Sequence, residues 1–146
     1  MRAVIQRVTA ANVKISERTI GQIQAGLVVL LGIKNGDTPK DVEYLAAKIL
    51  NLRIFSNQNN IEFDQSVLDI NGEILIVSQF TLYADTKKGR RPSFDAAARG
   101  QEAVDLYQQF VAKIKIANLK VETGEFGAMM QVELVNNGPV TIILES

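Results

Sequence analysis

The chain has 146 residues, of which 47% are hydrophobic, and this is enough for one globular domain over residues 1–146 with a sizeable core. Sixteen basic residues balance sixteen acidic ones, so any contact with nucleic acid has to come from a local patch rather than from net charge. The chain contains no Cys and no His, which excludes a disulfide framework, thiolate or imidazole metal ligands, and any Ser-His-Asp or Cys-His catalytic group.

The rest of the composition predicts neither a cofactor nor a membrane anchor. The Asp and Glu residues show no cluster typical of a magnesium site, so no metal and no cofactor are expected. The N-terminus lacks the apolar stretch of a signal peptide, and the apolar segment 28–33 is too short to cross a bilayer. We therefore expect a cytoplasmic protein.

Three apolar stretches open the chain and predict strands. They are rich in β-branched residues, and turn-like segments separate them, which favours two or three antiparallel strands. The stretches cover residues 3–8, 13–15 and 26–33.

Two helices are predicted from helix-start signals and helical spacing. Thr38 is expected to cap the first helix, with Pro39 in its first position and Asp41 in the capping-box position. Apolar residues then recur at helical spacing and carry this helix to Arg53. A similar apolar stripe predicts a second helix after Gly100.

The segment from Glu73 to Tyr83 predicts a central strand. It is apolar on both faces from Ile74 to Val77, which is typical of a strand that is covered on both sides. Two more strands are expected around residues 129–135 and 140–144. Together with the two helices, these strands predict an α+β fold whose helices pack on a curved, largely antiparallel sheet with a barrel-like core.

The polar end of this central strand is the first candidate for chemistry. If the strand continues, alternation places Gln79 and Thr81 on one face and Ser78 and Phe80 on the other. Thr81 would need a base to act as a nucleophile, and Asp85 would lie roughly 13 Å away along an extended strand. The hydroxyl would instead serve as a hydrogen-bonding group, or the strand-end amides would form an oxyanion hole. The plain alternative is a threonine hydroxyl that only satisfies a hydrogen bond at the sheet edge.

Two loops are further candidates. Four cations, Lys87, Lys88, Arg90 and Arg91, fall within five residues and form a candidate phosphate-binding patch for RNA. Solvated cations are common on loops, but this patch follows shortly after residues 78–81, so it would place phosphate binding beside the candidate site. Residues 137–139 (Asn-Gly-Pro) have the pattern of a turn before a strand, and a functional role would require an unusual backbone shape such as a cis bond.

Six motifs, in order over essentially the whole chain, resemble those of the bacterial-type D-aminoacyl-tRNA deacylases, also called D-tyrosyl-tRNA deacylases. One such motif would be a weak signal, whereas six in register are specific. They lie at residues 1–8, 78–82, 91–94, 106–111, 123–130 and 137–141.

The resemblance implies an activity and an assembly. The activity is hydrolysis of the ester bond in D-aminoacyl-tRNA, and of glycine mischarged on tRNA-Ala, with L-aminoacyl-tRNA spared. The assembly is a homodimer with its active sites at the subunit interface. A cis Gly138–Pro139 bond from the partner would enter each site, and its carbonyl oxygens would leave no room for an L-aminoacyl group.

The same resemblance implies roles for individual residues. Arg7 would hold the Gly138 and Pro139 carbonyls in place, and Met130 would line the pocket near the terminal adenosine. The residues facing the scissile ester would be Ser78, Gln79, Phe80 and Thr81, with the amides of the last two as oxyanion donors. The expected tRNA contacts, Lys87, Lys88, Arg90 and Arg91, come from the clustering of cations described above and not from the resemblance.

The chain departs from the family pattern at two positions. Asn137 stands where Asp is common, which affects a local hydrogen bond or charge. The family often has Pro near the position of Gly100, and its absence alters how the second helix begins. Two other functions compete with the leading one. A non-catalytic RNA-binding module would use residues 87–91, and a relative that proofreads an L-amino acid would need a trans Gly138–Pro139 bond.

Overall fold

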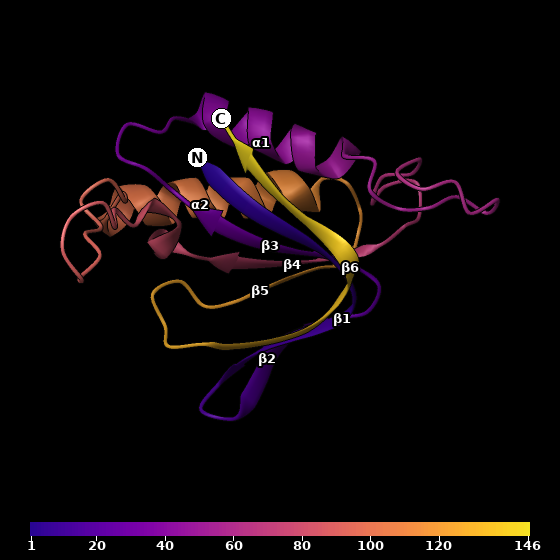
Figure 1. Cartoon of the computed structure of the whole chain (residues 1–146), viewed down its shortest axis with the longest axis horizontal. Helices are drawn as coiled ribbons and strands as arrows, with labels where there is room; N and C mark the ends of the chain where they lie inside the picture. Colours follow the sequence, from indigo (N-terminus) through magenta and orange to yellow (C-terminus); the bar gives the residue numbers. More distant parts are fainter.

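Two helices lie across one face of a twisted sheet, as the computed structural model of residues 1–146 shows (Figure 1). The helices are α1 (Pro39–Asn51) and α2 (Gly100–Lys115). The strands are β1 (Arg2–Ile15), β2 (Arg18–Ile23), β3 (Gly26–Gly32), β4 (Glu73–Ser78), β5 (Val121–Thr123) and β6 (Gln131–Glu145), and a short 3-10 helix, η1 (Phe80–Tyr83), follows β4. This is an α+β fold, as predicted.

The sheet is mixed and curls toward closure. Its strand order is β2-β1-β3-β4-β5, and β6 also pairs with β1. β1 is antiparallel to its three partners, whereas β4 is parallel to both β3 and β5, because α1 and α2 provide the crossovers that parallel neighbours need. β2 folds back against β5, and a side chain at Gly21 would lie only 3.1 Å from the carbonyl oxygen of Thr123, so glycine permits the near-closure of the barrel.

Several predicted boundaries differ from the structure. The stretches 3–8 and 13–15 belong to one strand, β1, because β6 pairs with it along almost its whole length. The two predicted C-terminal strands likewise form one strand, β6. The helix α1 ends at Asn51 rather than at Arg53, because Leu52 is already extended.

The apolar residues of β4 face two separate cores. Ile74 and Ile76 pack under the helices, and Leu75 and Val77 point into the barrel-like interior formed with β1 and β2. All four side chains are buried, as predicted for a strand covered on both sides. The Tyr107 hydroxyl of α2 also donates a hydrogen bond of 3.1 Å to the Ile76 carbonyl, which ties the helix layer to the central strand.

The predicted start of α1 is confirmed. The Asp41 carboxylate accepts hydrogen bonds from the Thr38 N–H (2.8 Å) and from the Thr38 hydroxyl (2.7 Å), and Pro39 occupies the first turn. Neither helix combines the length and the apolar character that a bilayer-spanning helix requires.

Candidate active site

The end of β4 is a turn rather than a continued strand. Ser78 is the last residue of β4 that pairs with β3, and the Gln79 N–H donates a hydrogen bond of 2.8 Å to the Leu31 carbonyl. Because β3 ends at Gly32, the chain beyond Ser78 has no neighbour to pair with and turns into η1. The predicted extension of the strand to Tyr83 is therefore wrong, and the alternation of faces along it does not apply.

A cavity of about 630 Å³ opens at this turn. Most of its lining residues are hydrophobic, and they come from β3, β4, the start of α2 and the segment before β6. Three of the predicted catalytic residues, Ser78, Gln79 and Phe80, line it together with Met130. The fourth, Thr81, is exposed and follows directly after the lining residues.

Aromatic side chains form the walls of this cavity. Phe80 and Phe94 meet edge to face with ring centroids 5.0 Å apart, and Phe126 packs against Tyr107 at 5.4 Å. Phe80 is 56% exposed, although it is a large apolar side chain. An open aromatic wall of this kind suits stacking of a nucleobase.

The polar groups at the turn include no evident base. The Gln79 side-chain amide donates a hydrogen bond to the Thr81 hydroxyl oxygen, which fixes the hydroxyl and uses one of its lone pairs. Burial raises the pKa of Tyr83 and of Tyr107 to about 12, so both phenols are neutral at pH 7. The Asp85 carboxylate accepts the Lys87 N–H at 2.9 Å and so faces the following loop. The arrangement therefore favours hydrogen-bonding over nucleophilic use of Thr81.

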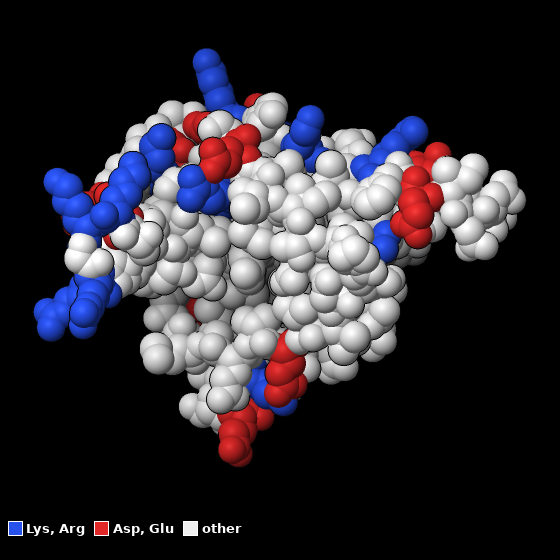
Figure 2. Space-filling view, viewed as in Figure 1, with Lys and Arg blue, Asp and Glu red and all other residues white.

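The cationic loop stands beside the cavity. Residues 86–92 project from a narrow neck, at which Asp85 and Ser93 exchange two backbone hydrogen bonds of 2.7 and 2.9 Å. Phe94, which comes directly after this neck, lines the cavity. The four cations at 87, 88, 90 and 91 are exposed, and basic side chains gather at the corresponding edge of the molecule in Figure 2. The sequence therefore correctly predicted that this loop lies close to the end of β4.

Gly138 and Pro139 do not line the cavity of their own chain. They lie in β6, both are exposed, and the peptide bond between them is cis. The predicted supporting residue, Arg7, is close to them. It is only 7% exposed, and its guanidinium donates hydrogen bonds to the carbonyls of Asn137 (3.0 Å) and Ile54 (2.6 Å).

Two polar residues, one at the cavity and one beside Gly138 and Pro139, were not identified from the sequence. Arg99 is the cap residue of α2 and lines the cavity, and it follows an alanine-rich segment that gives no functional signal. Asn136 makes two side-chain hydrogen bonds beside Gly138 and Pro139. Its position before Asn-Gly-Pro predicts only a turn, so the sequence offered a weak signal at best.

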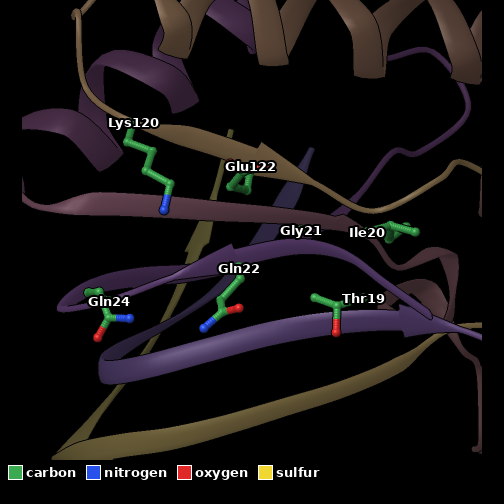
Figure 3. A pocket seen from close by; sticks show the side chains of 7 residues that line it. All are labelled: Thr19, Ile20, Gly21, Gln22, Gln24, Lys120 and Glu122. Carbon is green, nitrogen blue, oxygen red and sulfur yellow. The ribbon is translucent and has the colours of Figure 1, made fainter. Parts of the chain in front are cut away.

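A second hollow, of about 380 Å³, lies between β2 and β5 and shares no lining residue with the first (Figure 3). Thr19 and Gln22 of β2 line it together with Gln24, which follows that strand. Lys120 and Glu122 line it from the segment that includes β5. The Lys120 ammonium already forms an ion pair of 3.0 Å with Glu73. This hollow is polar and open, and none of the predicted site residues reaches it.

The family model and the curated relatives that match this chain all describe tRNA deacylases. The family model described as D-Tyr-tRNA(Tyr) deacylase matches residues 4–145. Curated proteins named D-aminoacyl-tRNA deacylase from Thermosipho africanus and Aquifex aeolicus are each 58% identical over 146 residues, with 100% of this chain and 97–98% of the relative covered.

Solved structures agree on the fold. A structure titled "c-Myc DNA Unwinding Element Binding Protein" is 44% identical, with a TM-score of 0.94 over 100% of this chain and 99% of that one. A structure of a probable eukaryotic D-amino acid tRNA deacylase is 17% identical, with a TM-score of 0.85 over 99% of this chain and 98% of that one, which shows likeness of fold alone. Since the family model and the relatives match almost the entire sequence, the chain belongs to the D-Tyr-tRNA(Tyr) deacylase family.

Proposed function

We propose that the protein hydrolyses the ester bond of D-aminoacyl-tRNA and releases the D-amino acid and the tRNA. The observation that carries this proposal is the cavity at the end of β4, which combines aromatic walls with the Ser78–Phe80 turn and has no evident general base. An aminoacyl ester is already activated, so its hydrolysis needs positioning and charge stabilisation more than a strong base. The names of the most similar curated proteins support the same activity.

Main-chain amides are the proposed catalytic groups. The N–H groups of Phe80 and Thr81 open η1, where amides have no acceptor within the helix. Water attacks the ester carbonyl, and the oxyanion that forms accepts hydrogen bonds from these amides. When the oxyanion collapses, the bond to the ribose oxygen of the tRNA breaks, and this oxygen takes up the proton that the attacking water gives up. Thr81, held by Gln79, positions the water, or the neighbouring ribose hydroxyl assists the step.

The aromatic cavity is the proposed binding place for the terminal adenosine. Phe80, Phe94 and Phe126 offer ring faces and edges for a base, and Met130 lines the same cavity. The loop that carries Lys87, Lys88, Arg90 and Arg91 would contact phosphates of the acceptor stem. Because the substrate is charged tRNA, we expect the protein to act in the cytoplasm.

Selection of the D form is proposed to come from a second copy of the chain. Gly138 and Pro139 are exposed and lie outside their own cavity, so they are free to enter the cavity of a partner. Their carbonyl oxygens would accept hydrogen bonds from the α-amino group of the substrate and occupy the space of an L side chain. Glycine has no side chain to exclude, so glycine mischarged on tRNA-Ala is an expected second substrate.

The decisive experiment compares D-tyrosyl-tRNA with L-tyrosyl-tRNA. We expect release of D-tyrosine while the L form is spared. Equal hydrolysis of both forms would overturn the chiral-selection part of the proposal. Salt-sensitive tRNA binding without turnover at any enzyme concentration would instead identify a non-catalytic RNA-binding module that uses the cationic loop. Turnover of the L form alone would identify a proofreader of L-amino acids.

A further inference from the structure

The pairing of β1 with β6 is interrupted opposite Arg7. Gln6 pairs with Thr141 and Val8 pairs with Asn136, so a single residue of β1 faces four residues of β6. These four, residues 137–140, form a short excursion from the sheet that we name the Gly-Pro loop. Because Gly138 and Pro139 have no partner in the register, other contacts have to fix their position.

The side chain of Asn136 closes the base of the Gly-Pro loop. Its amide nitrogen donates one hydrogen bond to the Val140 carbonyl, 3.0 Å away at the far end of the loop, and a second to the Arg7 carbonyl, 3.1 Å away on β1. Both N–H donors of this amide are therefore used. One side chain thus ties the two ends of the loop to each other and to the neighbouring strand.

The oxygen of the same amide lies against Gly138. A Cβ atom on that residue would come within 2.7 Å of the Asn136 Oδ1 atom, which is closer than such contacts allow. A side chain at position 138 would therefore push the Asn136 amide away from its two hydrogen bonds, and glycine avoids this.

Arg7 supplies the complementary tie. Its side chain binds the Asn137 carbonyl at 3.0 Å, and the Ile54 carbonyl, at 2.6 Å, anchors the same guanidinium in the protein interior. The Glu62 carboxylate lies 3.6 Å from it. The carbonyls on either side of Gly138 and Pro139 are thus each bound by a donor, one from Arg7 and one from Asn136, and the two donors are linked through the Arg7 carbonyl.

We infer that Asn136 is a positioning residue for chiral selection, acting through the carbonyl groups of the Gly-Pro loop. The inference rests on the proposed function, because it assumes that these carbonyls test the handedness of the substrate. A misplacement of about 1 Å is enough to disturb a selective contact of this kind. Loss of the Asn136 donors therefore widens the space available to an L side chain, while the cavity at β4 keeps its chemistry.

The test uses the Asn136→Asp variant. Asp has the shape of Asn, but its carboxylate would face the Arg7 and Val140 carbonyls without a proton to donate. We expect the ratio of kcat/KM for D-tyrosyl-tRNA to that for L-tyrosyl-tRNA to fall at least tenfold, mainly through faster turnover of the L form. Asn59→Asp is the matched control, because Asn59 is exposed and its side chain makes no hydrogen bond in the chain, and it should keep the wild-type ratio.

Two further measurements separate positioning from folding. The two carbonyl oxygens that face the introduced carboxyl group disfavour its charged form and so raise its pKa. As the pH falls toward 5 the group therefore gains a proton and regains one donor, and discrimination in Asn136→Asp should partly recover. Asn136→Ser, which is smaller and uncharged, should also lose discrimination, and its thermal unfolding shows whether the fold is intact. An unchanged D-to-L ratio in a folded variant would overturn the inference, and so would an equal loss of turnover on both substrates. A wild-type enzyme that does not hydrolyse D-aminoacyl-tRNA at all would instead refute the proposed function.

Discussion

At the scale of single residues, the site depends on how hydrogen bonds are distributed rather than on reactive side chains. The hydroxyl of Thr81 accepts a hydrogen bond from the Gln79 amide, which orients it without activating it. The oxyanion donors proposed here are main-chain amides, and a side-chain substitution does not remove them. The hydroxyl and the amides can therefore be tested separately.

Thr81→Val should reduce turnover of D-tyrosyl-tRNA, whereas Thr81→Ser should retain most of it. Valine keeps the shape and the main-chain amide but loses the hydroxyl, and one such hydrogen bond contributes about 0.5–1.5 kcal/mol, or roughly two- to tenfold in rate. Single-turnover rates of the two variants measure the effect directly. Full activity in Thr81→Val would show that the hydroxyl has no role.

At the scale of elements, α1 depends on its capping box. The pKa of Asp41 is lowered from 3.8 to about 2, first by the hydrogen bond from the Thr38 hydroxyl and then by the one from the Thr38 N–H. Because the folded-state pKa is depressed, the carboxylate stabilises the fold above about pH 4. This contribution disappears as the pH falls through about 2.

Asp41→Ala should therefore lower the Tm at pH 7 and have little effect near pH 2. The group is partly exposed, so we expect about 1 kcal/mol after allowance for solvent screening, or about 2–4 °C in a domain of this size. Thermal unfolding at both pH values tests this. Glu43→Ala is the control, since Glu43 is exposed on the same helix and its only ion pair is a surface pair of 3.5 Å with Lys113 of α2. A Tm difference that is the same at both pH values would rule out the capping carboxylate as its cause.

The proposed role of the cationic loop can be tested through the affinity for charged tRNA. Replacing all four basic residues at 87, 88, 90 and 91 with Ala should raise the KM for charged tRNA and leave kcat unchanged. It should also flatten the salt dependence of binding, because each phosphate contact to a duplex contributes about 0.9 to the slope. Removing four exposed lysines from the helices, Lys40, Lys48, Lys113 and Lys115, changes the net charge equally and should have little effect. If the two variants behave alike, the loop has no specific role.

At the scale of the whole molecule, β6 offers a surface for a second copy of the chain. It pairs only with β1, so one of its edges has no partner within the chain. Two apolar residues on it, Val135 and Ile143, are 60% and 64% exposed. The same strand carries Gly138 and Pro139, so an interface built on β6 would bring this pair to the partner molecule.

We expect sedimentation to give a particle of twice the 16.1 kDa chain mass. Ile143→Lys should weaken this dimer, because a charge would replace an apolar contact, and hydrolysis should lose its D preference although each cavity is intact. Ile116→Lys makes the same change at an exposed position at the end of α2 and is the control. A monomer that retains full discrimination would overturn the proposal that the partner supplies the selecting group.

Local patterns were enough to predict much of this molecule. The capping box of α1 lies within four residues, and the double-sided burial of β4 follows from an unbroken apolar run, so both were correctly predicted from adjacent residues. The absence of His and Cys excluded imidazole and thiolate catalysis directly from the composition, which can be read without knowledge of the fold. The nearness of the cationic loop to the end of β4 follows from a short connection.

Other features depend on contacts between distant segments, and only the tertiary structure decided them. β4 ends at Ser78 because its neighbour β3 ends beside it. The apolar run before Ser78 contains no signal for this end. The cavity gathers Phe94, Phe126 and Met130 from separate parts of the chain, and Asn136 and Arg7 meet across 129 residues. The sequence by itself determined which elements form and which chemistry is excluded, because these follow from local spacing and composition. Pairing partners across the sheet determined where strands stop and which polar groups hold the Gly-Pro loop, because those hydrogen bonds join residues that only the fold brings together.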